Sequence, residues 1–187
     1  MHLNRRAVAL GALALAAGRA ADGRVGPRES SVFRLVNRRP ESWHLPIWVV
    51  MQAGSLGAVW AASAVVWTRH DRREATRLAL VGTAVWAGVK LVKPLVGRGR
   101  PAAVLDDVRV RGQPQTGLGF PSGHAAVAMT LALLVPSPDP RQRRAAVGAA
   151  VIVGLARMYV GAHLPLDVVG GLAIGTAVAP TRSRPTR

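Results

Sequence analysis

The sequence predicts an all-α protein, a multi-pass transmembrane helical bundle, on three observations. Half of the 187 residues are hydrophobic and the mean hydropathy is +0.23, which is high for a soluble protein and usual for a small helical membrane protein. Apolar stretches of membrane-spanning or nearly spanning length recur along the chain. Short arginine-rich clusters separate these stretches, as in the cytoplasmic loops of membrane proteins.

Five apolar stretches are expected to be firm membrane spans. About 20 apolar residues cross the hydrocarbon core of a bilayer, and the range begins near 17. The first two stretches meet this length. The last three are shorter, but we still expect them to be spans because their polar outer ends would belong to a functional site. They run from Pro46 to Trp67, Leu78 to Gly97, Ser122 to Val135, Ala145 to Val160 and Leu164 to Ala179.

The N-terminal segment is expected to add a sixth, shorter element. Arg5 and Arg6 precede an apolar run from Ala7 to Ala17, a pattern shared by signal peptides, short spans and surface helices. We expect a short or interfacial helix here, followed by a basic, polar stretch along the outer surface. The predicted organisation is an N-terminal segment over 1–45, a membrane domain over 46–180 and a basic cytoplasmic tail over 181–187.

The arginine clusters predict the orientation, because cytoplasmic loops carry an excess of Lys and Arg. If the five spans alternate, three clusters fall on one side, which we assign to the cytoplasm. The connections over 98–120 and 161–163 then face outward, so the site is expected on the extracytoplasmic side of the cell membrane. The clusters are Arg69, Arg72, Arg73 and Arg77; Arg141, Arg143 and Arg144; and Arg182, Arg184 and Arg187.

The formal net charge of +16 by itself suggests a nucleic-acid partner, but its placement between apolar runs indicates membrane anchoring instead. No nucleic-acid partner is therefore expected. The chain has no cysteine, which excludes disulfides and thiolate metal sites. The outward carboxylates are mainly Asp106, Asp107 and Asp167, which form no ligand-like cluster, so neither a metal nor another cofactor is expected.

Three short segments at the edges of the apolar stretches hold the residues that phosphate chemistry needs. Hydrolysis of a phosphate ester requires charge neutralisation on the oxygens, a nucleophile and an acid. Lys93, Arg100 and Arg157 are fixed cations that can bind phosphate oxygens, although each alone could also be a side chain reaching from the interface to water. The segments run from Lys93 to Pro101, from Pro121 to His124 and from Arg157 to Asp167.

The second segment opens an apolar helix and is suited to bind an anion. Ser122 is a good N-cap, Gly123 permits close approach of a ligand, and the free N–H groups of a first turn attract phosphate. A helix cap followed by a histidine with ordinary partners explains this segment alone equally well.

The third segment contains the best candidate nucleophile. Pro165 suits the first position of a helix, which places His163 just before it and Asp167 in its first turn. A carboxylate there can hold one ring nitrogen and stabilise the positive ring formed after attack, so His163 is the candidate nucleophile. His124, without a nearby carboxylate, is the candidate general acid. Helix capping is the alternative role of Asp167.

Together these segments resemble the three-part signature of the type 2 phosphatidic acid phosphatase family. The matching patterns are Lys93-x6-Arg100-Pro101, Pro121-Ser122-Gly123-His124 and Arg157-x5-His163-x3-Asp167. The resemblance covers about Trp48 to Ala179. One departure is Ala156, where the family usually has serine, which puts one hydrogen bond near the phosphate in doubt.

The resemblance implies an integral-membrane, metal-independent phosphatase for a lipid phosphate or pyrophosphate, isoprenoid or phosphatidate-like, with the lipid and the bilayer as partners. His163 would attack to form a phosphohistidine, Asp167 would support it, and His124 would protonate the leaving group. The oligomeric state stays open. The implied phosphate-binding residues are Lys93, Arg100, Arg157, Ser122 and Gly123.

Two other functions fit parts of the pattern. A vanadium-dependent haloperoxidase is one, because vanadate mimics phosphate and that related family shares the pocket, but the small size and membrane helices argue against it. A non-catalytic lipid-phosphate binding or transport protein is the other. For binding alone, His124 and the pair of His163 with Asp167 are superfluous.

Overall fold

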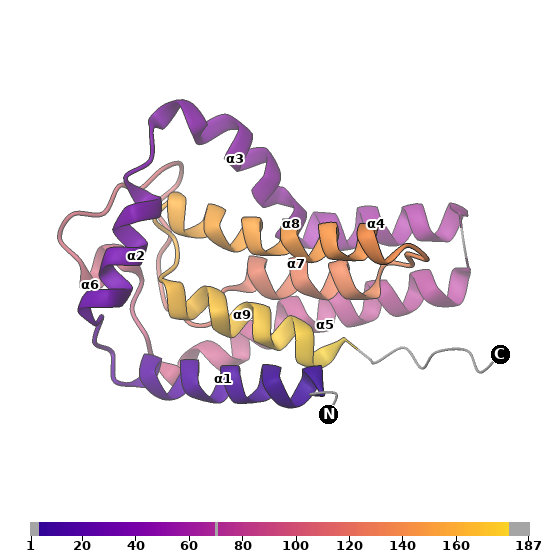
Figure 1. Cartoon of the computed structure of the whole chain (residues 1–187), viewed down its shortest axis with the longest axis horizontal. Helices are drawn as coiled ribbons and strands as arrows, with labels where there is room; N and C mark the ends of the chain where they lie inside the picture. The colour runs from indigo at the N-terminus through magenta and orange to yellow at the C-terminus, as the bar shows by residue number, and fades with distance from the viewer. Residues whose placement is uncertain (1–3, 70, 180–187) are drawn as a thin grey trace.

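The computed structural model describes residues 4–69 and 71–179, and the regular secondary structure of this part is helix, without strands. The predicted all-α class is therefore confirmed, while the proposed tail over 181–187, with its three arginines, lies outside the described residues. The helices are α1 (Arg5–Ala21), α2 (Pro27–Asn37), α3 (His44–Met51), α4 (Leu56–Arg69), α5 (Arg72–Val96), α6 (Pro101–Val104), α7 (Gly123–Leu134), α8 (Pro140–Tyr159) and α9 (Pro165–Val178). Of these, α1, α4, α5, α7, α8 and α9 run side by side along one axis (Figure 1).

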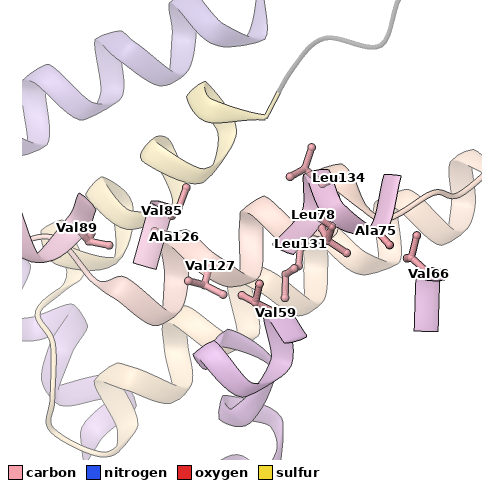
Figure 2. Close-up of a cluster of buried hydrophobic side chains, with 10 residues drawn as sticks. All are labelled: Val59, Val66, Ala75, Leu78, Val85, Val89, Ala126, Val127, Leu131 and Leu134. Atoms are coloured by element: carbon pink, nitrogen blue, oxygen red, sulfur yellow. The ribbon is translucent and has the colours of Figure 1, made fainter. Parts of the chain in front are cut away.

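Helix α7 is the centre of the bundle, because α5, α8 and α9 all pack against it and most of its residues are buried. Figure 2 shows the apolar cluster that it shares with α4 and α5. On α5 the buried positions recur at helical spacing, so one face meets α7 and the other is left outward. The cluster consists of Val59, Val66, Ala75, Leu78, Val85, Val89, Ala126, Val127, Leu131 and Leu134.

Two glycines bring the backbones of α7 and α9 into direct contact. A Cβ atom added to Gly171 would lie 2.3 Å from the carbonyl oxygen of Ser122, and one added to Gly175 would lie 2.5 Å from that of Ala126. The Ser122 amide also donates a hydrogen bond of 2.8 Å to the carbonyl oxygen of Asp167. These contacts fix the start of α9 against the start of α7.

The stretch from Pro46 to Trp67, expected as one span, is not a single continuous helix. It divides into α3 and α4, which are bent by 64° around a 3₁₀ turn over Gln52–Gly54. A Cβ atom on Gly54 would lie 2.5 Å from the carbonyl oxygen of His124, so this turn packs directly on the first turn of α7. Apolar composition does not reveal such a bend, because the contact that requires it is tertiary.

The expected number of membrane spans stays a prediction. By length and hydropathy, one continuous described segment qualifies, Arg72–Val104, and the bent pair of α3 and α4 qualifies only if counted together. Helices α7 and α9 have 12 and 14 residues. Helix α1 lies alongside α9, and Arg5 and Arg6 donate to the carbonyl oxygen of Ala179 at the other helix's end (Figure 1).

We expect Gly171→Ala to destabilise the bundle by about 1–3 kcal/mol, because the added methyl group forces α9 away from α7. Thermal unfolding in detergent measures this change. The matched control is Gly148→Ala in α8, where a Cβ atom would meet nothing within 4 Å. Its better helix propensity should leave stability unchanged or higher by up to about 1 kcal/mol. Equal unfolding temperatures for Gly171→Ala and wild type would contradict the proposed close packing.

Candidate active site

The three sequence segments lie at one end of the bundle (Figure 1). Because α7, α8 and α9 alternate in direction, the start of α7, the end of α8 and the start of α9 meet there, beside the end of α5. All the residues expected to form a site are carried by these helix ends and the loops between them. The site is thus assembled from elements whose relative positions are set by the packing on α7.

The turn between α8 and α9 holds His163 and Asp167 in the interior. Gly161 turns the chain with a φ of +77°, and the amides of Ala162 and His163 both donate to the carbonyl oxygen of Arg157. His163 is 3% exposed and Asp167 is fully buried. Both side chains are therefore removed from bulk water by the way the two helices are joined.

The Asp167 carboxylate both caps α9 and faces the His163 ring. Its Oδ2 atom accepts a hydrogen bond of 2.9 Å from the Leu164 amide and lies 3.5 Å from His163 Nδ1. The second distance is longer than a normal hydrogen bond, so the carboxylate oxygen faces this nitrogen at contact distance without bonding to it. Nδ1 has no hydrogen-bond partner among the described residues. The two roles weighed from the sequence, capping and orientation of the ring, therefore coexist.

Arg98, which was not among the residues predicted for the site, has a fully buried side chain beside Asp167. Its Nη1 atom lies 3.3 Å from Asp167 Oδ1, and it forms a second ion pair with Glu29 of α2. Burial opposes the charge of Arg98, but the hydrogen bonds that Arg98 donates to Glu29 and the negative charge of Asp167 outweigh this effect and raise its pKa. Arg98 belongs to the first segment, yet its pattern did not distinguish it from an exposed loop arginine.

Two of the three expected phosphate-binding cations are held by backbone carbonyls. Lys93 Nζ donates to the carbonyl oxygens of Leu118 and Gly119, at 2.8 and 3.1 Å. Arg100 donates to Thr116 and Ala162, at 2.9 Å in both cases. These bonds tie the cations to the loop before α7 and to the turn before α9, so their positions are restrained without neutralising carboxylates.

Arg157, the third cation, is 5% exposed at the end of α8. Its Nη1 atom lies 2.9 Å from Met51 Sδ, a weak acceptor, and its Nε atom has no hydrogen-bond partner among the described residues. Buried donors normally have partners, so Arg157 retains capacity for a strong acceptor such as a phosphate oxygen.

The two histidine rings interact electrostatically with the nearby positive side chains of Arg157 and Lys93. Burial lowers the pKa of His163 to about 4, Asp167 opposes this shift, and Arg157 and Lys93 add to it. The ring of His124, in the first turn of α7, interacts with both Arg157 and His163. The groups expected to act on one phosphate are therefore close enough to influence each other.

Ser122 and Gly123 begin α7 as the sequence predicts. Ser122 is the N-cap and is fully buried, with its Oγ atom 3.5 Å from the Ala125 amide. A Cβ atom on Gly123 would meet only Val89, at 3.9 Å, so this position is not closed by packing. A ligand can approach the backbone there more closely than at any bulkier residue.

Ala156, where the family pattern has serine, faces apolar surroundings. It is 3% exposed and packs in a cluster with Met51, Tyr159 and Val160. It also lines an apolar cavity of about 300 Å³ between α3 and α8, with Trp43, Ile47 and Leu155 among the other lining residues. A hydroxyl group at this position would have few polar partners.

The described carboxylates and histidines do not gather into a metal-binding cluster. Asp107 forms ion pairs with Arg34 and Arg38 of α2, whose hydrogen bonds lower its pKa. Over residues 4–69 and 71–179, no group of three or more His, Asp or Glu side chains has the arrangement of a metal site.

The low pKa of His163 predicts a pH dependence of stability. Between about pH 6.5 and pH 4 the ring takes up a proton in the unfolded chain but not in the folded one, so the free energy of unfolding falls as the pH falls. The loss should reach about 3 kcal/mol. It is measured as the difference in thermal unfolding between wild type and His163→Gln, and parallel pH curves would contradict the prediction.

The chain is similar in sequence to known lipid phosphatases. It is 32% identical over 119 residues to the lipid A 1-phosphatases of Rhizobium etli and Rhizobium johnstonii, which covers 58% of this chain and 51% and 49% of theirs. The chain thus spans about half the length of these two relatives. It is 26% identical over 152 residues to an undecaprenyl-diphosphatase of Sulfolobus acidocaldarius, which covers 79% of this chain and 73% of that protein.

The fold and the sequence profile agree with these matches. Aquifex aeolicus LpxE superposes with a TM-score of 0.74 at 25% identity, over 82% of this chain and 93% of that one. A transmembrane PAP2-type phosphatidylglycerolphosphate phosphatase from Bacillus subtilis has the same fold, with a TM-score of 0.71 at 19% identity over 93% and 92% of the two chains. The profile of the PAP2 superfamily matches residues 74–184, more than half of the chain. The resemblance seen in the three segments is confirmed, and the chain belongs to the PAP2 superfamily.

Proposed function

We propose that this protein is an integral-membrane phosphatase that hydrolyses a lipid phosphate or pyrophosphate through a phosphohistidine, without a metal ion. The observation that carries the proposal is the buried ring of His163, with Nδ1 facing the Asp167 carboxylate and with Lys93 and Arg157 in electrostatic range. A neutral imidazole with one nitrogen oriented in this way presents the lone pair of the other nitrogen. Membership of the PAP2 superfamily supports it.

The first chemical step transfers the phosphoryl group to the protein. Nε2 of His163 forms a bond to phosphorus while the bond from phosphorus to the lipid oxygen breaks, and His124 donates a proton to that oxygen. Nδ1 keeps its proton, and the Asp167 carboxylate stabilises the positive ring. The positive side chains of Lys93, Arg100 and Arg157 stabilise the negative charge on the non-bridging phosphate oxygens.

The second step releases phosphate and restores both rings. A water molecule attacks the phosphorus, and His124, now neutral, accepts one of its protons. The bond between phosphorus and Nε2 breaks, so His163 returns to its neutral form. In this proposal the Gly123 amide and the Ser122 hydroxyl, at the start of α7, donate hydrogen bonds to the phosphate oxygens.

The substrate class proposed is a lipid with a terminal phosphate or diphosphate, isoprenoid or phosphatidate-like. The site lies at the end of a bundle with broad apolar outer surfaces, and the cavity lined by Ala156 offers additional apolar contact. Lipid A and undecaprenyl diphosphate, the substrates named for the similar proteins, share this chemistry: a phosphate on a lipid anchor. Isoprenoid diphosphates, phosphatidate-like lipids and lipid A therefore all belong in a substrate screen.

We propose a multi-pass protein in the cell membrane, with the site on the extracytoplasmic side. The arginines around α4, α5 and the start of α8 lie at the opposite end of the bundle from the site (Figure 1). Since the chain has no cysteine, Gln113→Cys should be labelled in intact cells by an impermeant thiol reagent. The control Arg141→Cys should be labelled only after lysis, and the reverse pattern would overturn the orientation.

Purified protein should release phosphate from at least one lipid of the screen in the presence of a chelator, and vanadate should inhibit it. Strict dependence on added magnesium would count against the mechanism. With labelled substrate, wild type should form an acid-labile phosphoenzyme, and His163→Ala should form none because the attacking nitrogen is missing. Label that persists in this variant would assign the nucleophile elsewhere.

His124→Ala serves as the matched variant in the same experiment. It should lower turnover by about 10²–10⁴-fold, the usual contribution of a general acid, while lipid binding is retained. Unchanged lipid binding with lost turnover separates an enzyme from a protein that only binds lipid phosphates. Turnover equal to wild type would remove His124 from the mechanism.

A further inference from the structure

Glu29 of α2 reaches the catalytic end of the bundle from a part of the chain that the superfamily profile does not cover. Its Oε2 atom lies 2.6 Å from Arg98 Nη2, and its Oε1 atom accepts hydrogen bonds of 3.0 Å from Arg98 Nη1 and from the Leu166 amide. The Glu29 side chain is only 10% exposed. The carboxylate therefore links α2 to the loop after α5 and to the first turn of α9.

Arg98 continues this link to Asp167. Its Nη1 atom, which donates to Glu29, also donates to Asp167 Oδ1 at 3.3 Å. Oδ2 of the same carboxylate is occupied by the Leu164 amide and faces His163. Because both oxygens are held from different directions, the Asp167 carboxylate cannot rotate freely. The contact of Arg98 with Oδ1 therefore helps to fix the position of Oδ2 next to the His163 ring.

We propose that Glu29 and Arg98 are positioning residues for Asp167, so that α2 contributes to the geometry of the active site. This inference rests on the proposed phosphohistidine chemistry. The charges explain why two carboxylates are needed. Arg98 alone would neutralise Asp167 and weaken its attraction for the positive ring of His163. Glu29 neutralises Arg98 in turn, so the buried group of three keeps a net charge of −1 beside the ring.

Other contacts hold α2 in place independently of Glu29. Asn37 donates to the carbonyl oxygens of Arg109, Met158 and Tyr159, and Arg34 and Arg38 form ion pairs with Asp107. Substitution of Glu29 therefore removes a charge near Asp167 while these anchors remain. Asp107→Asn is the matched control, because it breaks ion pairs of α2 without touching Arg98 or Asp167.

The experiment compares kcat and KM of full-length Glu29→Gln, Glu29→Asp and Asp107→Asn with wild type on one lipid phosphate. We expect Glu29→Gln to lower kcat by roughly 10- to 100-fold, as for the partners that orient catalytic histidines at metal centres, with KM within about twofold. Glu29→Asp keeps the charge and should recover part of kcat. Asp107→Asn should resemble wild type in both constants.

Equal kcat for Glu29→Gln and Asp107→Asn would overturn the proposal, as would a loss confined to KM. If Glu29→Gln does not give folded protein by gel filtration, Glu29→Asp decides: a kcat below that of Asp107→Asn at the same KM supports the proposal, and an equal kcat overturns it. Wild type that forms no phosphoenzyme and releases no phosphate overturns the proposed function and this inference together. Active wild type with unaffected variants overturns the inference alone.

Discussion

The buried carboxylate of Asp167 is the contact on which the rest of the site depends. A charge in the interior is costly unless it is paired and hydrogen-bonded, and this one is satisfied by the Leu164 amide, by Arg98 and by its position beside His163. Arg98 comes from the loop after α5, whereas Leu164 and His163 lie together in the turn just before α9. Removing Arg98 would leave the carboxylate without its buried counter-charge, so the ion pair that stabilises Asp167 also holds these two segments together.

Close helix packing makes this arrangement possible. The ends of α7 and α9 meet because glycines on α9 let the two backbones touch, and the turn at Gly54 packs onto α7 for the same reason. Backbone contacts of this kind leave little freedom to slide, because interiors are densely packed. His163, the proposed nucleophile on the turn before α9, and His124, the proposed general acid on α7, are thus positioned by packed helices.

The positively charged side chains near the site differ in the groups that hold them. Lys93 and Arg100 are restrained by backbone carbonyls, which leave their charge intact, while Arg157 keeps an unsatisfied donor in the interior. Arg98 is different, since Glu29 and Asp167 neutralise it and withdraw it from direct phosphate binding. Arg98 and Arg100 lie two positions apart, yet their surroundings differ: carboxylates neutralise Arg98, whereas Arg100 is held by backbone carbonyls and keeps its charge.

The sequence alone determined the helical class, the bounds of α7 and α9 to within one residue, and the three segments that supply the site, because apolar periodicity, caps and motif spacing are local properties. Only the tertiary structure decided the bend between α3 and α4, the earlier start of α5 at Arg72, and the partnership of Glu29 with Arg98. The bend between α3 and α4 results from the contact of Gly54 with α7, and the ion pair of Glu29 with Arg98 joins residues 69 positions apart. Contacts between distant segments leave no local pattern, so no reading of residue order could have supplied them.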